Sequence, residues 1–143
     1  MLAWRLCREP FADLSGEGAR RYGGRWNSPG RPLIYAASTA ALAVLEARVH
    51  LDLPPELLPD DYVLVTIDLG DAAIEEVYAI PELPQAFGDA WLSEQRSPVL
   101  QVPSAIVPES PNFLINPAHT RASGMHIVQR RGFEFDRRLW LTG

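Results

Sequence analysis

Residues Arg20 to Glu46 read RRYGGRWNSPGRPLIYAASTAALAVLE and divide into a loop, a strand and a helix. The loop is rich in glycine and arginine, the apolar strand runs from Pro32 to Ala36, and the helix opens at Ser38. Four arginines fall within twelve residues, beside glycines that allow a backbone to approach a ligand closely. The stretch therefore suits an anionic ligand.

The helix after the strand is predicted from its first residues and from the prolines beyond it. Ser38 can act as the N-cap, because its hydroxyl can accept a hydrogen bond from a free amide of the first turn, and strong helix formers follow. Pro54 and Pro55 predict that the helix ends near Leu53. Tyr35 stands at the carboxyl end of the strand, where ligand contacts are frequent although a core tyrosine is the commoner outcome.

Glu46 is expected to point into the protein. Leu42, Leu45 and Val49 have the spacing of a buried helical stripe, and the glutamate lies within that stripe. A carboxylate in this place is costly unless it is paired or hydrogen-bonded, which is compatible with a functional group. The structural alternatives are a buried ion pair with an arginine, or another helix phase that leaves Glu46 in water with Arg48.

The composition is that of an ordinary soluble protein of 143 residues, with 47% hydrophobic and 22% charged residues. One domain spanning residues 1–143 is expected. No segment approaches the about 18 apolar residues of a membrane span, and the first residues lack the apolar run of a signal peptide. A cytoplasmic location is therefore expected.

The basic residues are all arginine, thirteen in number, and the chain contains no lysine. The lack of lysine excludes a Walker phosphate loop and a lysine Schiff base. Arginine offers a planar fork of donors that matches phosphate and carboxylate oxygens. The net charge of −5 argues against nonspecific nucleic-acid binding, which needs a broad cationic surface.

Alternating and β-branched segments predict a mixed sheet with one main helix, which is an α+β fold. Besides Pro32–Ala36, the predicted strands are Leu2–Arg8, Tyr62–Leu69, Val99–Val107 with an interruption at Pro103, Asn112–Asn116, and a final hairpin of Ile127–Gln129 and Phe133–Phe135. A short helix is predicted over Phe87–Glu94. The segment Pro10–Arg21 is polar and glycine-rich, and it is a candidate lid without regular structure.

Some single side chains leave alternatives open. Arg5 shares one face of its predicted strand with small residues, so it could reach into a cleft or lie on the surface. Cys7, the one cysteine, is expected to pack rather than to act as a nucleophile. No metal site is expected, because the chain lacks HExxH and CxxC motifs. A triad built on Ser104 and His119 is a weak prediction, since no Gly-x-Ser-x-Gly elbow occurs.

Taken together, the glycine- and arginine-rich loop, the aromatic side chain at a strand end, the inward glutamate and a serine could hold a nucleotide and act on its sugar. The arginines would bind phosphates, the tyrosine would stack on a ring, and the carboxylate would stabilise positive charge at the anomeric carbon. A pyridinium ring leaves as a neutral group and needs no general acid, so one carboxylate could suffice.

Several segments resemble the RES family, which supplies toxins of bacterial toxin–antitoxin pairs and is named for its arginine, glutamate and serine. In family order, the matching segments are Gly23–Asn27, Leu33–Ala36, Leu42–Glu46, Val102–Ala105 and Asn112–His119. The resemblance implies an ADP-ribosyltransferase-like fold. It also implies NAD as the substrate, without a further cofactor, and growth arrest through NAD consumption.

The resemblance implies roles for individual residues. Those implied in catalysis are Glu46, Arg25, Tyr35 and Ser104. Those implied in NAD binding are Arg5, Gly24, Arg25, Trp26, Asn27 and Tyr35. By this resemblance Arg25 would bind the phosphates, Tyr35 would lie at the nicotinamide ribose and Glu46 would be the catalytic glutamate. Asn116 and His119 match the family motif without an assigned role.

The resemblance further implies a partner, a helix-turn-helix antitoxin of the Xre type that blocks the NAD cleft, and it allows a homodimer within the complex. The acceptor stays open between water, inorganic phosphate and a protein side chain; the last would make the chain a protein ADP-ribosyltransferase. A noncatalytic module would bind NAD without turnover, with Glu46 in a structural ion pair. A ribonuclease that uses the arginines of residues 130–131 and 137–138 is disfavoured by the acidic net charge.

Overall fold

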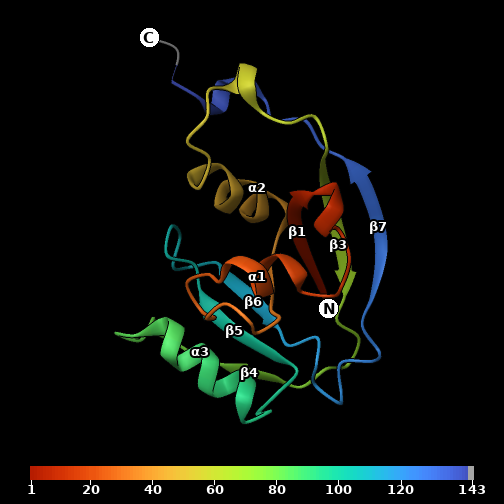
Figure 1. Ribbon diagram of the computed structural model, residues 1–143, viewed down its shortest axis with the longest axis vertical. Coiled ribbons are helices and arrows are strands. Elements are labelled where there is room, and N and C mark those ends of the chain that lie inside the picture. Colours follow the sequence, from red (N-terminus) through yellow and green to blue (C-terminus); the bar gives the residue numbers. More distant parts are fainter. Residues whose placement is uncertain (142–143) are drawn as a thin grey trace.

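Seven strands form one mixed sheet in the computed structural model of the chain, which describes residues 1–141 (Figure 1). The strands are β1 (Leu2–Arg8), β2 (Ile34–Ala37), β3 (Tyr62–Asp68), β4 (Ile74–Glu76), β5 (Val99–Pro103), β6 (Pro111–Ile115) and β7 (His126–Gly132). They lie in the order β4-β5-β6-β2-β1-β3-β7, and the neighbours are antiparallel except for β4 and β5. The sheet thus joins segments from the whole described chain.

Few helices accompany this sheet. Within residues 1–141 the α-helices are α1 (Glu17–Tyr22), α2 (Ala40–Val49) and α3 (Pro84–Ser93), and single 3-10 turns occupy Glu9–Phe11, Pro55–Leu57 and Arg137–Leu139. The predicted α+β fold with a mixed sheet and few helices is confirmed. In the part of the chain that the structure describes, no helix has the length and apolar character needed to cross a membrane.

The sheet has a loose junction at its centre. The outer neighbour of β1, strand β3, pairs with it at every position from Leu2 to Arg8. On its other side β1 pairs with β2 only through Trp4 and Ala37. Figure 1 shows β1, β3 and β7 on one side of the molecule and β4, β5 and β6 on the other. Two groups of strands therefore meet where β2 leads into α2.

Helices α2 and α3 pack on different parts of the sheet. On α2, Leu42 and Ala43 are buried in a cluster with Ala37 of β2 and Leu64 of β3. On α3, the fully buried Trp91 packs in a second cluster that includes residues of β5 and β6. Burying such apolar surface stabilises the fold by roughly 25 cal/mol per Å². These contacts fix the two helices that border the candidate site.

Helix α2 differs at both ends from the prediction. Its N-cap is Thr39 rather than Ser38, because the Thr39 side chain accepts a hydrogen bond from the Leu42 amide at 3.0 Å, whereas the Ser38 amide donates to a carbonyl of β6. The helix ends at Val49 rather than near Leu53. Val49 is 50% exposed, so the prediction that it extends the buried stripe is wrong.

The segment Pro10–Arg21 is also more ordered than predicted. It contains most of the first 3-10 turn and of α1, so the expectation of a lid without regular structure is wrong. Gly16 precedes the helix with φ of 71°, and a Cβ there would lie 2.8 Å from the Leu33 amide nitrogen. The glycine content that indicated flexibility instead serves a tight approach to the chain before β2.

The predicted hairpin at the end of the chain is wrong as well. Instead of turning at residues 130–132, the chain continues as β7, and Arg130, Arg131 and Gly132 pair with Val65, Leu64 and Val63 of β3. The alternation of apolar and polar residues that suggested two short strands belongs to one strand and its extension. That extension begins with the Phe133 amide, which donates to the Tyr62 carbonyl.

An aromatic cluster ties the chain after β7 to the end of α2. Trp140 lies under the Arg48 guanidinium, 4.2 Å from its carbon to the ring centre, and its indole N–H donates to the Leu53 carbonyl at 2.9 Å. Arg48 also donates to the Leu139 carbonyl at 3.0 Å. Phe135 packs edge-on against Trp140. A cation–π contact between Arg48 and Trp140 and an aromatic contact between Trp140 and Phe135 therefore hold the end of the chain against the C-terminal end of α2.

Candidate active site

The side chain of Glu46 lies in a small hydrogen-bonded cradle. Its Oε1 atom accepts from the Ser104 hydroxyl at 2.7 Å and from Asn112 Nδ2 at 2.8 Å. The prediction that Glu46 points inward is therefore confirmed. Neither structural alternative applies within residues 1–141: Glu46 forms no ion pair there, and Arg48 turns to Trp140 and the backbone.

Ser104 follows directly after β5 and is fully buried. Its hydroxyl oxygen accepts from the amides of Ile106 and Val107, each at 3.1 Å, in a turn that side-chain hydroxyls commonly form. A hydroxyl has one proton and two lone pairs, so these two amides leave the proton free to point at Glu46. The turn orients Ser104 as a donor to the carboxylate.

Asn112 completes the cradle from β6, where it pairs with Ala37 of β2 and Val102 of β5. Its Oδ1 atom is buried and has no hydrogen-bond partner within residues 1–141. A buried acceptor without a partner costs free energy, about 1–3 kcal/mol, so its retention favours a role in the site. Asn112 was not predicted as a site residue, although one polar side chain in an apolar strand was a usable signal.

The cradle forms hydrogen bonds to only one of the two carboxylate oxygens of Glu46. Both donors reach Oε1, and no hydrogen bond joins Oε2 to another group in the described chain. Ser104 and Asn112 therefore fix the direction of the carboxylate, while Oε2 stays available to a ligand. This division suits a group that must present negative charge to a substrate in one orientation.

Tyr35 lies on the same face of the sheet as the cradle. It pairs with Leu114 while Ala37 pairs with Asn112, so Tyr35, Ala37 and Asn112 point to one side. Its hydroxyl accepts from the Trp26 amide at 2.9 Å and donates to Asn27 Oδ1 at 2.7 Å. Burial raises the pKa of Tyr35 to about 12, so the phenol is neutral at physiological pH.

The hydroxyl of Tyr35 holds an irregular segment, residues 23–31, which we call the arginine loop. Asn27 is fully buried in it, and its Nδ2 atom donates to the carbonyls of Ala19 and Arg31, both at 2.9 Å. Trp26 is 3% exposed and packs edge-on against Phe87 of α3. These two predicted NAD-binding side chains point into the protein and shape the loop.

Directly before the buried Trp26 and Asn27, Arg25 is exposed. It forms no salt bridge with any residue in the described part of the chain. Gly24 beside it packs on Tyr35, because a Cβ at this position would lie 2.6 Å from the tyrosine oxygen. The loop thus buries the side chains of Trp26 and Asn27 and leaves two arginines exposed: Arg31, which pairs with Asp89, and Arg25, which lies near Tyr35.

The structure does not bring Arg5 to Glu46. In β1 the side chains of Trp4 and Leu6 pack in the cluster under α2, so Arg5 lies on the opposite face, near Gly18 of α1. Its Nη1 atom is buried without a hydrogen-bond partner in the described chain. Cys7 shares that face and packs against the core, and burial raises the pKa of its thiol, as a packing role requires.

No serine triad forms. The His119 ring bonds the Gln95 carbonyl and accepts from the Arg121 amide, whereas Ser104 bonds Glu46. In residues 1–141, no group of three or more histidine, cysteine, aspartate and glutamate side chains is arranged to hold a metal ion.

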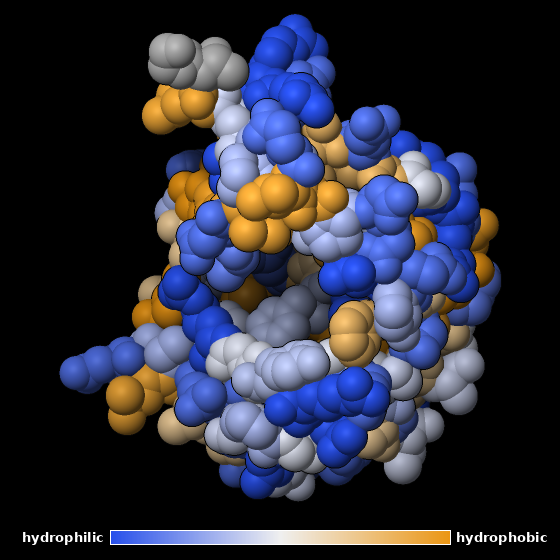
Figure 2. All heavy atoms as spheres, turned by 45° about the horizontal axis from the view of Figure 1, so that its top comes forward, coloured by the Kyte–Doolittle hydropathy of each residue, from blue (hydrophilic) through white to orange (hydrophobic). Residues whose placement is uncertain are grey.

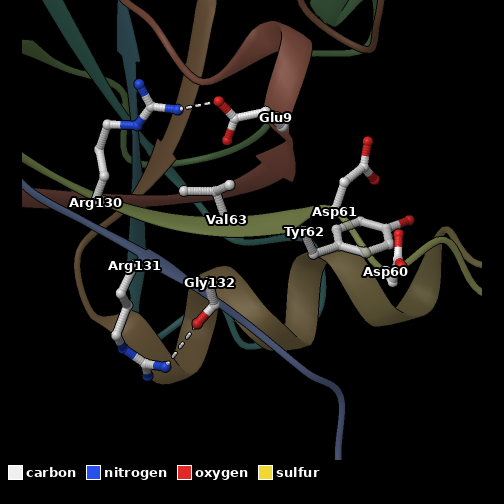
Figure 3. Close-up of a pocket in the computed structure, with 8 residues that line it drawn as sticks. All are labelled: Glu9, Asp60, Asp61, Tyr62, Val63, Arg130, Arg131 and Gly132. Carbon is white, nitrogen blue, oxygen red and sulfur yellow. Dashed lines mark hydrogen bonds and ion pairs between the residues drawn. The ribbon is translucent and has the colours of Figure 1, made fainter.

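One face of the molecule is hollowed: Figure 2 shows a depression near the middle of the face, with hydrophilic residues along much of its rim. A separate pocket of about 330 Å³ lies where β3 begins and β7 ends (Figure 3). Of its two arginines, Arg130 bonds Glu9, and the lining includes none of the residues predicted for catalysis or NAD binding. This pocket is therefore separate from Glu46.

A protein-family model described as the RES domain matches residues 2–138 of the chain. The chain belongs to this family. The resemblance on which the sequence analysis relied is thereby confirmed. Among RES relatives, the toxin Res of Pseudomonas putida is 38% identical and covers 98% of this chain and 100% of its own length. The Prs ADP-ribosylating toxin of Sphingobium sp. is 42% identical over 95% of this chain and 94% of its own length.

Two further similarities of this chain concern a mycobacterial protein. The NAD(+) phosphorylase MbcT of Mycobacterium tuberculosis is 40% identical over 54% of this chain and 48% of its own length. The crystal structure of the M. tuberculosis MbcT–MbcA toxin–antitoxin complex contains a chain with a TM-score of 0.76 to this one. The two are 25% identical, and the match covers 92% of this chain and 83% of that one. The RES fold described above is therefore shared with a toxin of known structure.

Proposed function

We propose that this chain is the toxin of a toxin–antitoxin pair and that it consumes NAD by cleaving the nicotinamide–ribose bond. The observation that carries the proposal is the cradle, in which Ser104 and Asn112 hold one oxygen of Glu46 and leave the other free. Membership of the RES family, whose relatives include an NAD(+) phosphorylase and an ADP-ribosylating toxin, supports the choice of NAD.

The carboxylate of Glu46 is proposed to act on the ribose of NAD. As the bond to nicotinamide breaks, positive charge develops at the anomeric carbon, and a fixed carboxylate stabilises it. Nicotinamide leaves as a neutral molecule, so no protonating acid is needed. Ser104 and Asn112 keep the carboxylate from turning away, which lowers the cost of orientation in the transition state.

The arginine loop and Tyr35 are proposed to bind the remainder of NAD. Arg25 is free to make charge-assisted hydrogen bonds to the phosphates. The Tyr35 hydroxyl is already engaged by the loop, so its ring rather than its oxygen would contact the nicotinamide ribose. The acceptor of the ADP-ribosyl group is proposed to be water or inorganic phosphate.

The alternative acceptor is a protein side chain. The name of the Sphingobium relative supports this alternative, and the name of the mycobacterial relative supports phosphate. Proton NMR of NAD incubated with the purified chain, with and without phosphate, separates the acceptors by the sugar product formed. Labelled NAD offered with a cell extract then reports transfer to a macromolecule.

The control for this experiment is Glu46→Gln. Nicotinamide release that requires Glu46 would support cleavage at this site. Release that continues unchanged in the variant would remove Glu46 from the mechanism. Calorimetric NAD binding without release in any buffer or extract would instead support a noncatalytic binding module.

For the partner, we propose an antitoxin of the Xre helix-turn-helix type, acting in the cytoplasm by covering the NAD site. The similarity to a chain from a toxin–antitoxin complex supports an antitoxin as such. Adding the purified antitoxin to the NMR assay tests the proposal. Nicotinamide release that continues in a stable complex of the two proteins would contradict it. The mass of that complex in solution tests whether it contains a homodimer of this chain.

A further inference from the structure

One face of helix α3 is devoted to the arginine loop. Gln85, Gly88 and Asp89 are spaced three and four residues apart, so they lie on a single side of the helix. All three contact the backbone or side chains of residues 23–31. The helix therefore faces the loop with a carboxylate, an amide and a glycine.

Gln85 bonds the loop on both sides of Arg25, at Gly24 and Asn27, and Asp89 bonds the next residue, Ser28. The Asp89 carboxylate accepts from the Ser28 amide at 2.9 Å and from the Ser28 hydroxyl, and it lies 3.6 Å from Arg31 Nε. Gln85 Nε2 donates to the carbonyls of Asn27 at 3.1 Å and of Gly24 at 3.3 Å. These contacts join α3 to parts of the chain about 60 positions away in sequence.

Gly88 allows this contact. It is buried, and a Cβ on it would lie 1.8 Å from the Trp26 carbonyl oxygen. Its φ is not in the left-handed region, so the requirement is for space alone. Any side chain at this position would push α3 and the arginine loop apart.

The loop is thus held from two sides. Tyr35 bonds the Trp26 amide and the Asn27 side chain from the sheet, and α3 bonds the loop at Gly24, Asn27 and Ser28. In the described chain, no hydrogen bond links α3 to Glu46, Ser104 or Asn112. The helix therefore contacts the part of the site that carries Arg25 and does not contact the cradle.

We infer that Gln85, Gly88 and Asp89 are positioning residues for NAD binding, because α3 sets the conformation in which the arginine loop presents Arg25. The inference rests on the proposed function. It separates the site into two independently supported parts. Changes on α3 alter the affinity for NAD and leave the cleavage step, which depends on the cradle, largely unchanged.

Steady-state kinetics with NAD tests the inference. Gly88→Ala is expected to raise KM by about 10²-fold, the loss that a displacement of about 1 Å can cause, with kcat changed much less. Gly124→Ala is the matched control, because that position has open space for a Cβ and no positive φ. Asp89→Ala and the exposed Gln85→Ala are expected to raise KM by smaller factors, and Asp89→Asn less than Asp89→Ala.

The set of variants keeps the test decisive if Gly88→Ala does not fold, because Gln85 is exposed and Asp89 is not part of the core. A wild-type KM in both Asp89→Ala and Gln85→Ala would overturn the inference. A fall in kcat at unchanged KM would overturn it too, since that pattern belongs to the cradle.

Hydrogen exchange of the loop amides separates this inference from the proposed function. Faster exchange of the Ser28 amide in Asp89→Ala, without NAD present, is expected if α3 holds the loop, and unchanged exchange would overturn the inference. A wild-type chain that releases no nicotinamide would overturn the proposed function, and the exchange result would then decide by itself whether α3 fixes the loop.

Discussion

The cradle and the arginine loop both contain polar side chains with hydrogen bonds inside the protein, but these side chains bond different groups. In the cradle, Ser104 and Asn112 converge on one oxygen of the Glu46 carboxylate. In the loop, the buried side chain of Asn27 bonds the backbone carbonyls of Ala19 and Arg31, and Arg25 in the same segment is exposed and forms no salt bridge in the described chain. Under the proposed function, the cradle residues act on the substrate directly, whereas Asn27 sets the shape of a backbone.

Removing the charge from the cradle gives the largest expected effect and most directly tests the contrast. Glu46→Gln keeps the shape of the side chain and an oxygen that can accept from Ser104, but it loses the negative charge. We expect NAD binding to persist and kcat to fall by at least about 10²–10³-fold, as when preorganised electrostatic stabilisation is lost. Nicotinamide release measured by NMR checks this, with the exposed Glu134→Gln as control.

Removing the cation of the loop should give the opposite kinetic pattern. Arg25→Ala is expected to weaken NAD binding by ~1.5–3 kcal/mol through loss of a charge-assisted phosphate contact, with kcat nearly unchanged. Calorimetry with the Glu46→Gln background avoids turnover during the titration. Arg121→Ala removes another exposed arginine and is the control. Unchanged affinity in Arg25→Ala would take Arg25 out of the site.

Removing one of the two hydrogen-bond donors to Glu46 tests how much the cradle contributes beyond the carboxylate itself. Ser104→Ala removes one donor to Glu46 and leaves the amides of Ile106 and Val107 without their acceptor. We expect kcat to fall about tenfold, which corresponds to about 1.4 kcal/mol, at similar KM. Ser93→Ala is the control for loss of an exposed hydroxyl. A changed KM at constant kcat would contradict the assignment of Ser104 to the cradle.

The smallest effect is expected where the sheet supports the loop. Tyr35→Phe keeps the ring but loses the bonds to Trp26 and Asn27, so we expect a few-fold rise in KM, corresponding to about 1 kcal/mol. A steady-state KM for NAD measures this change. A KM equal to that of the wild type would show that the loop keeps its shape without the hydroxyl.

Tyr35 also predicts a pH dependence of stability. Its folded pKa of about 12 exceeds the usual value of 10.0, so the unfolded chain loses this proton first as the pH rises. The contribution of the neutral phenol to stability is therefore present below pH 10 and is lost between about pH 10 and 12. Denaturant unfolding across this range should show a steeper decline for the wild type than for Tyr35→Phe. Tyr22→Phe, at an exposed tyrosine, is the control.

The sequence was informative about which residues carry charge and where the strands run. Glu46 could be placed inside because its spacing from Leu42 is local, and local helix geometry is regular. Its partner Asn112 was missed because the contact spans the pairing of β2 with β6, and the register of two distant strands is not written in either one. The family resemblance, rather than periodicity, singled out Ser104.

The errors have a similar physical origin. Ser38 and Thr39 can both cap a helix, and the choice was made by a carbonyl of β6 that takes the Ser38 amide. Glycines around α1 suggested flexibility, yet Gly16 instead allows its backbone to approach the Leu33 amide closely. The residue type alone does not tell whether a glycine makes the backbone flexible or leaves space for another backbone to pack closely.

The distance in sequence between Glu46 and its two hydrogen-bond partners affects how late in folding the cradle is completed. Glu46 contacts Ser104 and Asn112, which lie 58 and 66 positions further along the chain. Long-range contacts of this kind form late in folding, because a large loop must close before they add any stability. In a partly folded chain, helix α2 can therefore be present while Glu46 still lacks its hydrogen bonds to Ser104 and Asn112. Under the proposed function, we therefore expect NAD cleavage to begin only with the completed sheet.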